Sequence, residues 1–400
     1  MGGAVGHLSH VFEDRNLTLA DVKNILTRAA LGKLNSVSEK FDGLNMVISW
    51  DSTIDSLKIA RSLSDVKSGG LDRAGLESKF KNRGKIAIAF NTAYDVLTTA
   101  LSSLSKQSKI DIFGEYINIW YSIEVIYRDN MNVVLYDVDA IIFHEHPMFF
   151  RYGHDVSIKS KHFLFQTVLE QIPLMQKDLC WKVLEPKSVK MLEMTNKSPL
   201  YDSLMALDAL RDDFELLDES TIDDYLTKVL RLHLEDNSKM QGCLQFAELI
   251  IDRCLERKGS SLTQIKKLLP KELYPLVFEF VENSNLVLRN ATERLEKIIS
   301  DFSNELLCSL NSRLISSSEI EVFRIKSSVR DSTNEVLESG NKIQIENLQR
   351  HLARLGNVEE IKTPIEGIVF EYKEKFYKLT GKFAAINQII GITRYGKLNE

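Results

Sequence analysis

The sequence is poor in cysteine and has no long apolar run. Its four cysteines, Cys180, Cys243, Cys254 and Cys308, are scattered and form no CxxC pair. We therefore expect a reduced, cytosolic chain, and a zinc site built from thiolates is not expected. No apolar run reaches the roughly 18 residues that a membrane-spanning helix needs. The first residues, MGGAVGHLSHVFED, lack a basic region followed by an apolar core, so we expect no signal peptide and no membrane partner.

A strong excess of one charge sign is also absent. The 400 residues carry 51 basic and 56 acidic side chains, which argues against a general nucleic-acid-binding protein. Residues 1–137 carry 16 of each sign, residues 361–400 carry 7 basic and 4 acidic, and residues 138–360 carry 28 basic and 36 acidic. We expect any polyanion to be held by the two ends of the chain. The length allows two or three domains with at least one buried core.

The first third of the chain has mostly strand-like patterns. Thr18, with Asp21 three residues later, predicts a capping box at the start of a helix within 17–34. The runs NMVISWD and SLKIARS predict two strands joined by a polar turn. Residues 63–83 predict a loop, KIAIAF another strand, and 92–105 a short helix. Three β-rich runs between 111 and 143 predict an antiparallel sheet that is buried on at least one face.

The middle of the chain is helical. From about 156 to 357 apolar residues recur every three or four positions, and the clearest helices are predicted over 201–216, 222–234, 240–257 and 282–311. After them EGIVFEYKEKFYKLTG predicts a β-hairpin with the charged turn YKEK, and FAAINQIIG predicts a closing helix. We therefore expect an α+β protein. Its parts are an N-terminal loop and helix (1–34), an antiparallel β-sheet domain (35–150 and 358–400) and a large all-helical insertion (151–357).

Five short segments stand out together: EKFDGLN (39–45), ARS (60–62), IFGEY (112–116), LYDV (135–138), and EGIVF with FYKLTG (366–381). In their order and approximate spacing they resemble the motifs of the covalent nucleotidyltransferase superfamily, the ATP-dependent RNA and DNA ligases. The closest resemblance is to RNA ligases of the RNA ligase 2 type, including bacteriophage-encoded ones, which would act in the host cytoplasm. The resemblance covers residues 35–145 and 360–385 and implies an antiparallel-sheet adenylation domain.

The first segment resembles the family's KxDG nucleotide-attachment motif. The resemblance implies that Lys40 attacks the α-phosphate of ATP, expels pyrophosphate and forms lysyl-AMP, with Glu39 and Asp42 in the nucleotide-binding segment. A free lysine is protonated at pH 7, so this chemistry requires burial and nearby cations that lower its pKa. Gly43 gives the backbone room to approach phosphate. Asn45 matches an asparagine typical of RNA ligases, where it lies near the phosphates.

The next motifs imply contacts to the rest of the nucleotide. Arg61, at the end of the following strand, would contact the phosphates or the receiving end, with Lys67 as its rival. Glu115 would accept hydrogen bonds from the ribose hydroxyls. Tyr136 would stack on the adenine, a contact worth roughly 1–3 kcal/mol, and Asp137 follows it as in the family. The alternative interpretations are a surface arginine, an exposed glutamate and a core tyrosine.

The last two motifs imply the charged groups around the reacting phosphate. Glu366 would hold Mg²⁺ or help to order Lys40. Lys378 would contact the α-phosphate, stabilise the charge that develops there and depress the pKa of Lys40. The family has a second lysine two residues after this one, whereas here Thr380 stands there and Lys382 is the nearest replacement. The long insertion is another departure, as is the missing C-terminal module, for which the helical block is expected to substitute.

Three functions agree with these patterns. The first is an ATP- and Mg²⁺-dependent RNA ligase that adenylylates a 5′-phosphate end and then seals it to a 3′-hydroxyl, with RNA ends favoured over DNA ends. The second is a nucleotidyltransferase that acts on a protein, a cap structure or a small molecule. The third is a non-catalytic relative with a binding or structural role. The sequence does not decide whether the nucleotide is ATP or GTP. The acidic helices of 200–235 are either a solvated bundle or a protein-docking surface.

Two groups of histidines remain. His7 and His10, with Asp14, could form a metal or phosphate site at the entry to the first helix. His144, Glu145 and His146 alternate along a strand or loop, so that both histidines share one face. Since no third ligand is evident there, ordinary packing is the favoured interpretation.

Overall fold

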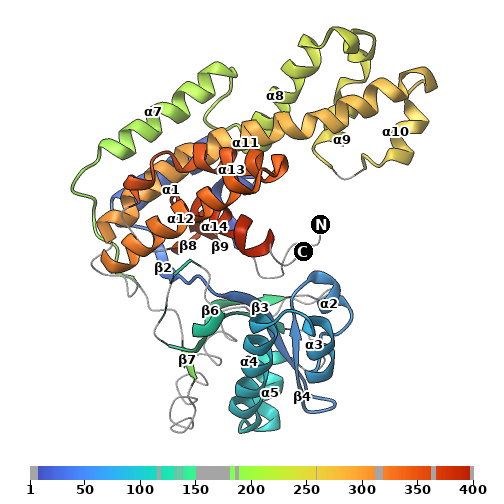
Figure 1. Cartoon of the computed structure of the whole chain (residues 1–400). Helices are drawn as coiled ribbons and strands as arrows, with labels where there is room; N and C mark the ends of the chain where they lie inside the picture. The colour runs from blue at the N-terminus through green and yellow to red at the C-terminus, as the bar shows by residue number, and fades with distance from the viewer. Residues whose placement is uncertain are drawn as a thin grey trace.

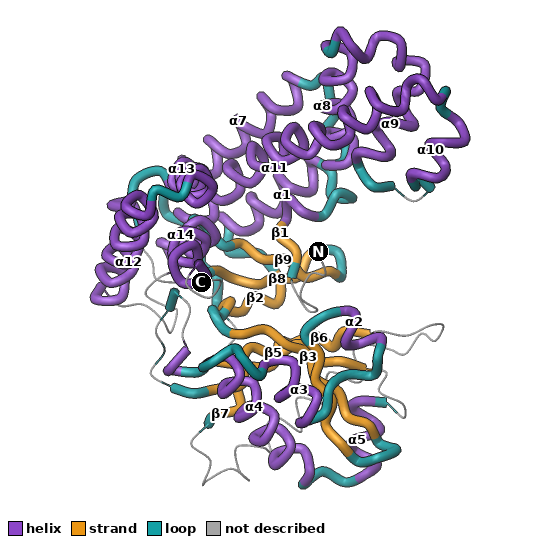
Figure 2. Tube along the Cα trace, turned by 45° about the vertical axis from the view of Figure 1, so that its right-hand side comes forward, coloured by secondary structure: helices purple, strands orange, loops and turns teal. Residues whose placement is uncertain are grey.

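The computed structural model describes residues 8–114, 119–130, 133–134, 136, 138–149, 181–184, 189–257, 259–310, 319–361 and 366–396. The chain is an α+β protein, as expected. A long helical block lies at one end of the molecule and a sheet with its covering helices lies at the other (Figure 1). A second sheet lies between these two parts, directly beneath the helices (Figure 2).

The larger sheet has five strands in the order β4-β3-β5-β6-β7. They are β3 (Leu44–Asp51), β4 (Ser56–Ala60), β5 (Ile119–Ile126), β6 (Ala140–Phe149) and β7 (Lys182–Leu184). The pairs are antiparallel except β6 with β7. Because β7 lies within residues 151–357, the prediction that this insertion is all-helical is wrong. Its short strand extends the sheet edge, where Ala140 pairs with Lys182.

Helices α4 (Lys85–Ser102) and α5 (Lys106–Phe113) pack on the larger sheet. The predicted strand KIAIAF is the first part of α4, so that prediction is wrong. Phe90, Ala93, Leu97 and Leu101 recur at helical spacing and are buried against the sheet, and this continuous apolar face outweighs the local β-propensity. The predicted loop 63–83 contains α2 (Leu63–Lys67) and α3 (Arg73–Phe80), which begin at side-chain caps.

The smaller sheet has four strands in the order β1-β9-β8-β2. They are β1 (Ser9–His10), β2 (Asn35–Lys40), β8 (Gly367–Tyr372) and β9 (Lys375–Leu379). The predicted hairpin of β8 and β9 is confirmed. Lys373 and Glu374 form its turn with φ angles of 49° and 62°, the left-handed geometry that a two-residue hairpin needs. Residues from both ends of the chain therefore build one sheet.

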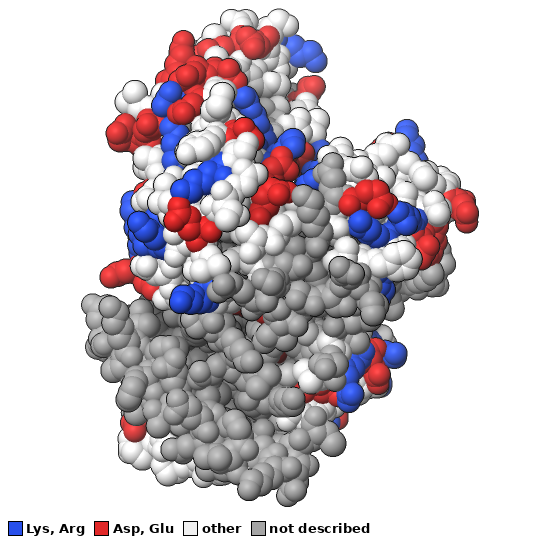
Figure 3. All heavy atoms as spheres, turned by 90° about the vertical axis from the view of Figure 1, so that its left-hand side faces the viewer, with Lys and Arg blue, Asp and Glu red and all other residues white. Residues whose placement is uncertain are grey.

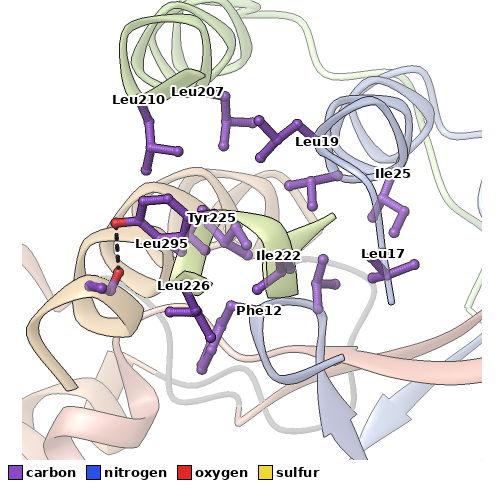
Figure 4. Close-up of a cluster of buried hydrophobic side chains, with 14 of the residues drawn as sticks. Phe12, Leu17, Leu19, Ile25, Leu207, Leu210, Ile222, Tyr225, Leu226 and Leu295 are labelled. Atoms are coloured by element: carbon purple, nitrogen blue, oxygen red, sulfur yellow. Dashed lines mark hydrogen bonds between the residues drawn. The ribbon is translucent and has the colours of Figure 1, made fainter. Parts of the chain in front are cut away.

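The helical block covers this smaller sheet. It contains α1 (Leu19–Ala30), α7 (Ser198–Asp213), α8 (Ile222–Asp236), α9 (Ala247–Cys254), α10 (Leu262–Leu268) and α11 (Tyr274–Leu310), with the 3₁₀ segments η1 (Val11–Glu13) and η3 (Ser238–Phe246). The predicted cap of α1 is confirmed, because Thr18 and Asp21 exchange both hydrogen bonds. Figure 4 shows Phe12, Leu17 and Leu19 packed among side chains of α7, α8 and α11, where the Tyr225 hydroxyl donates to the Ala291 carbonyl at 3.3 Å.

A separate core joins the last helices, α12 (Glu319–Ser339), α13 (Lys342–Leu355) and α14 (Phe383–Gly396). Val133 and Val134 of the chain between β5 and β6 are buried in it. Figure 3 shows basic and acidic side chains interspersed over the helical part of one face. Among the described residues, none of the helices combines the length and the apolar character that crossing a membrane would require.

Candidate functional site

Strand register brings two of the predicted lysines onto one face of the smaller sheet. Lys40 lies opposite Gly367, and Val369 lies opposite both Ser38 and Lys378. Because side chains alternate along strands, Lys40 and Lys378 share a face. Neighbouring positions such as Ile368 belong to the core under the helices, so the two lysines point away from the helical block. The short segment 41–43 then carries the chain from β2 into β3 of the larger sheet.

Lys40 is paired with the predicted Glu366. Their Nζ and Oε1 atoms are 2.5 Å apart, and their side chains are only 12% and 15% exposed. Gly367, which follows Glu366, lets β8 and β9 pack closely, because a Cβ atom at this position would lie 2.2 Å from the carbonyl oxygen of Leu379. A larger residue would have to push β8 and β9 apart, next to the Lys40–Glu366 pair.

A fourth charged residue of the site was missed from the sequence. Glu124 of β5 pairs across the sheet with Asn45 of β3, and its charge acts on Lys40. Its Oε2 atom would lie 3.1 Å from a Cβ atom at Gly43, so the KxDG glycine leaves room for this carboxylate. The signal that could have revealed it is a single acid in the wholly buried run IWYSIEVI, since an acid is rarely buried without a specific partner. The predicted Glu115 and Asp137 lie outside the described residues.

The pKa of Lys40 is shifted in the direction opposite to the one that the motif resemblance implies. Burial alone would lower the pKa of Lys40, but Glu366, Glu124 and Asp42 outweigh it and raise that pKa. Burial, helped by the nearby Lys40 charge, instead lowers the pKa of Lys378 to about 8. The direction for Lys40 is therefore opposite to the expectation that neighbouring cations depress its pKa, because the attraction of the three carboxylates outweighs burial.

The pKa of Glu366 is raised. Burial is the main cause, and the like charges of Asp42 and Glu124 add to it, while Lys40 acts in the opposite direction. Burial would also raise the pKa of Glu124, but His144, Lys40 and Arg61 hold it below its usual value. Two carboxyl groups of one site are thus driven in opposite directions, which leaves Glu366 as the better proton acceptor of the two.

Two acceptor atoms at the site have no hydrogen-bond donor among the residues that the structure describes. They are Asn45 Oδ1 and Glu124 Oε2, and both are buried. The other ends of these side chains are engaged: Asn45 Nδ2 donates to Ser122 Oγ at 3.0 Å, and Glu124 Oε1 lies 3.5 Å from His144 Nε2. A buried acceptor without a donor costs roughly 1–3 kcal/mol. The pair therefore suits a ligand that brings hydroxyl or amino hydrogens, or a cation.

Asp42 and Tyr136 hold the turn that follows Lys40. The Asp42 carboxylate accepts hydrogen bonds from the backbone of Val133 at 2.6 Å and of Val134 at 2.9 Å. The Tyr136 hydroxyl accepts one from the Asp42 backbone at 2.9 Å. Arg324 of α12 donates to the carbonyl of Val133 in turn. The predicted stacking of Tyr136 on adenine stays a prediction, while these contacts show that the ring lies beside the Lys40 turn.

Of the remaining predicted residues, Arg61 borders the site, whereas Glu39 and Lys382 lie elsewhere. The Arg61 guanidinium donates to the Asn45 carbonyl and lies 5.4 Å above the Phe90 ring, so it borders the site. Glu39 is buried, and strand alternation turns it to the opposite face from Lys40. Lys382 lines a cleft beside α11.

No protein-family model, no curated protein and no solved structure matches this chain.

A metal site made by protein groups alone is absent from the described part of the chain, where no three His, Cys, Asp or Glu residues gather around one point. Mg²⁺ commonly takes one or two carboxylates and completes its shell with water and substrate phosphates, so the carboxylate of Glu366, the predicted ligand, fits that role. In the predicted group of His7, His10 and Asp14, the Asp14 carboxylate accepts hydrogen bonds from Lys375 at 3.0 Å and from the Tyr377 hydroxyl at 2.8 Å. His7 lies outside the described residues.

Proposed function

We propose that this chain is a covalent nucleotidyltransferase of the ATP-dependent RNA ligase kind, with Lys40 as the residue that is joined to AMP. The observation that supports it most is the buried group of Lys40, Glu366, Glu124 and Lys378. These residues lie far apart in the sequence and meet on two facing sheets, next to two unpaired acceptors. A purely structural ion pair would need neither the second lysine nor acceptors that lack donors.

In the proposed first step the Lys40 amine attacks the α-phosphorus of ATP. The N–P bond forms as the bond to pyrophosphate breaks. The lysine must first lose a proton, and Glu366 Oε1 is close enough to take it. The raised pKa of Glu366 makes this transfer less costly than transfer to an ordinary carboxylate. This assigns Glu366 as the general base for Lys40 in addition to its predicted role of ordering the lysine.

Lys378 and Arg61 supply positive charge in this proposal. Lys378 belongs to the buried Lys40 group and Arg61 borders it, and both would offset the negative charge that builds up on the phosphate. Mg²⁺ would supply further charge neutralisation on the phosphates. Burial keeps these electrostatic interactions strong because little water screens them.

Glu124 and Asn45 would bind the nucleoside. Their unpaired oxygens both require donors, and the ribose hydroxyls of ATP are donors of the right kind. Glu124 thus takes the role that the motif pattern assigned to Glu115. The activated AMP would then pass to a 5′-phosphate end of RNA, and a 3′-hydroxyl would displace AMP to seal the strand.

The decisive experiment is transfer of label from α-labelled ATP to the purified protein with Mg²⁺. We expect label that survives denaturation and is released by pyrophosphate. Lys40→Ala and Lys40→Arg should both lose it, because arginine keeps the charge but is not a nucleophile at neutral pH. Labelled GTP tests the choice of purine, and a nicked RNA duplex tests sealing. A protein that folds and yet takes no label from either nucleotide would refute the enzymatic proposal.

A further inference from the structure

A cleft lies between α11, α13 and the first turn of α14, outside the Lys40 site. Its volume is about 310 Å³. It adjoins a hollow of about 670 Å³ that extends to α7, and Lys297 and Lys382 line both. We call the smaller hollow the α11–α14 cleft. Its basic lining residues are Arg294, Lys297, Arg350, Arg354 and Lys382.

Most of these cations have acidic partners, and one does not. Arg354 pairs with Glu296, Lys297 lies 2.7 Å from Asp301, and Arg294 lies 2.6 Å from Asp213. Arg350 makes no ion pair or hydrogen bond within the described part of the chain. Burial is the main reason that the pKa of the neighbouring His351 is lowered to about 4, and the charges of Arg354 and Arg350 add to it. The lining residues that α13 contributes to the cleft are Arg350, Ala353 and Arg354, of which two are basic and none is acidic.

The cleft lies next to the Lys40 group. Lys382 follows Lys378 by four residues, at the end of β9. The 3₁₀ segment η1 contacts both α11 and β9, and its Glu13 acts electrostatically on Lys378 and on the cleft residue Glu296. Because Lys378 lies on the face of the smaller sheet that points away from the helices, a ligand that fills the cleft would have to pass the end of β9, between Leu379 and Lys382, to reach the lysines.

We propose that the α11–α14 cleft binds backbone phosphates of the polynucleotide strand whose 5′-phosphate end is presented to Lys40. The inference rests on the proposed function and deepens it by naming the acceptor and the surface that holds it. Guanidinium groups bind phosphate oxygens in a planar, two-pronged geometry, which suits Arg350. A single phosphate or pyrophosphate ion would leave most of the cleft and the adjoining hollow empty.

The lining of the adjoining hollow favours a polynucleotide over an acidic polypeptide. Asp202, Asp301 and Glu305 line it. These carboxylates would repel phosphates and acidic side chains alike, so backbone phosphates would have to lie along the basic side of the α11–α14 cleft. The bases of a polynucleotide bring amino and imino groups from which the carboxylates of the hollow can accept hydrogen bonds, whereas a row of acidic side chains brings no donors. The basic residues come mainly from the acidic middle of the chain, so the expectation that only the two ends would hold a polyanion did not anticipate this surface.

The test is fluorescence anisotropy with the full-length protein and a 5′-phosphorylated single-stranded RNA of about 12 nucleotides, a usual site size for such proteins. It is made without ATP and over a range of salt concentrations. We expect Arg350→Glu to weaken binding at least tenfold, the loss expected for one charge-assisted hydrogen bond. The slope of log K against log salt should become shallower by about 0.7 for each phosphate that the variant no longer binds. Arg350→Gln should give an intermediate loss, and Arg83→Glu, an exposed arginine on the loop before α4, is the matched control.

Label transfer from ATP on the same preparations separates the two proposals. Label transfer without RNA binding at low salt would overturn the cleft proposal and leave adenylylation standing. RNA binding that Arg350→Glu weakens, in a protein that takes no label, would support the cleft and refute the enzyme. Equal binding by Arg350→Glu and Arg83→Glu would place the RNA elsewhere. Competition by inorganic phosphate or by polyglutamate at the concentration of RNA phosphate would show that the cleft is not selective for a polynucleotide.

Discussion

The pairing of Lys40 with Glu366 makes a specific prediction about stability and pH. In Lys40→Met the lysine is replaced by an apolar side chain of similar length, and Glu366 keeps its burial and its two acidic neighbours. Breaking a buried ion pair from one side costs roughly 3–5 kcal/mol when the remaining charge stays ionised. Because Lys40 is the group that lowers the pKa of Glu366, its removal should raise that pKa further.

The sign follows from linkage between protonation and folding. A carboxyl group with a raised pKa in the folded state holds its proton while the unfolded chain has already lost it. Its contribution to stability is therefore present at low pH and is lost as pH rises through the folded pKa. Relative to the wild type, Lys40→Met should accordingly lose stability as pH rises above about 7, the pKa of Glu366 in the wild type. The loss should be about 1.4 kcal/mol for each pH unit, and so about that much between pH 5 and pH 8.

The double variant Lys40→Met/Glu366→Gln is the matched control. It removes the buried charge, so most of the stability lost at pH 8 should return. Unfolding in urea, followed by the fluorescence of the buried Trp50 and Trp120, measures the difference at each pH. If Lys40→Met were equally unstable at pH 5 and pH 8, or if the double variant recovered nothing, the charge of Glu366 would not be the cause and the electrostatic account of the site would fail.

Three further predictions concern the residues around this pair. Gly367→Ala should lower the unfolding free energy by about 3 kcal/mol or more and abolish label transfer, because its Cβ atom would clash with the Leu379 carbonyl oxygen. In the control Gly242→Ala the added Cβ atom would meet nothing within 4 Å, so thermal melts should show little change in stability. His144→Phe should raise the KM for ATP more than it changes kcat, since His144 positions the Glu124 carboxylate, and His144→Gln should restore part of the loss in steady-state kinetics. Asp42→Ala should lower stability by about 2–4 kcal/mol because it removes two charge-assisted hydrogen bonds, and hydrogen exchange should show faster opening at the backbone amides that Asp42 holds.

Local patterns predicted the elements that depend on neighbouring residues. The cap formed by Thr18 and Asp21 and the hairpin turn at Lys373 both require interactions within a few positions, and both are present. The strand prediction for KIAIAF is wrong because these six residues suit a strand, while the apolar face that makes them helical extends well beyond them to Leu101. The helical period becomes clear only over several turns, so a six-residue run is too short to reveal it.

Only the residues of the candidate site that belong to the resembling motifs were predicted from the sequence. Lys40, Glu366 and Lys378 are grouped by the family pattern, and strand register then places the two lysines on one face. Glu124 was missed because its position depends on the cross-strand pairing with Asn45, which no local pattern reveals. The proposed role of Arg350 was likewise not predicted, because residues 138–360 were judged by their acidic total, which hides the basic side chains of α13.

The helical insertion is structurally coupled to the candidate site. The β8–β9 hairpin carries Lys378, and its other face is buried in the same core as α1, α7, α8 and α11. On the opposite side, α12 holds Val133, which holds Asp42 in turn. Neither the hairpin nor the turn after Lys40 can therefore keep its place if the helices unfold. An insertion of roughly 200 residues that lay only on the surface would tolerate deletion. The contacts of the hairpin and of α12 instead make the insertion part of the core that holds one sheet of the site. We therefore expect its deletion to unfold the protein rather than to remove only a contact with a ligand.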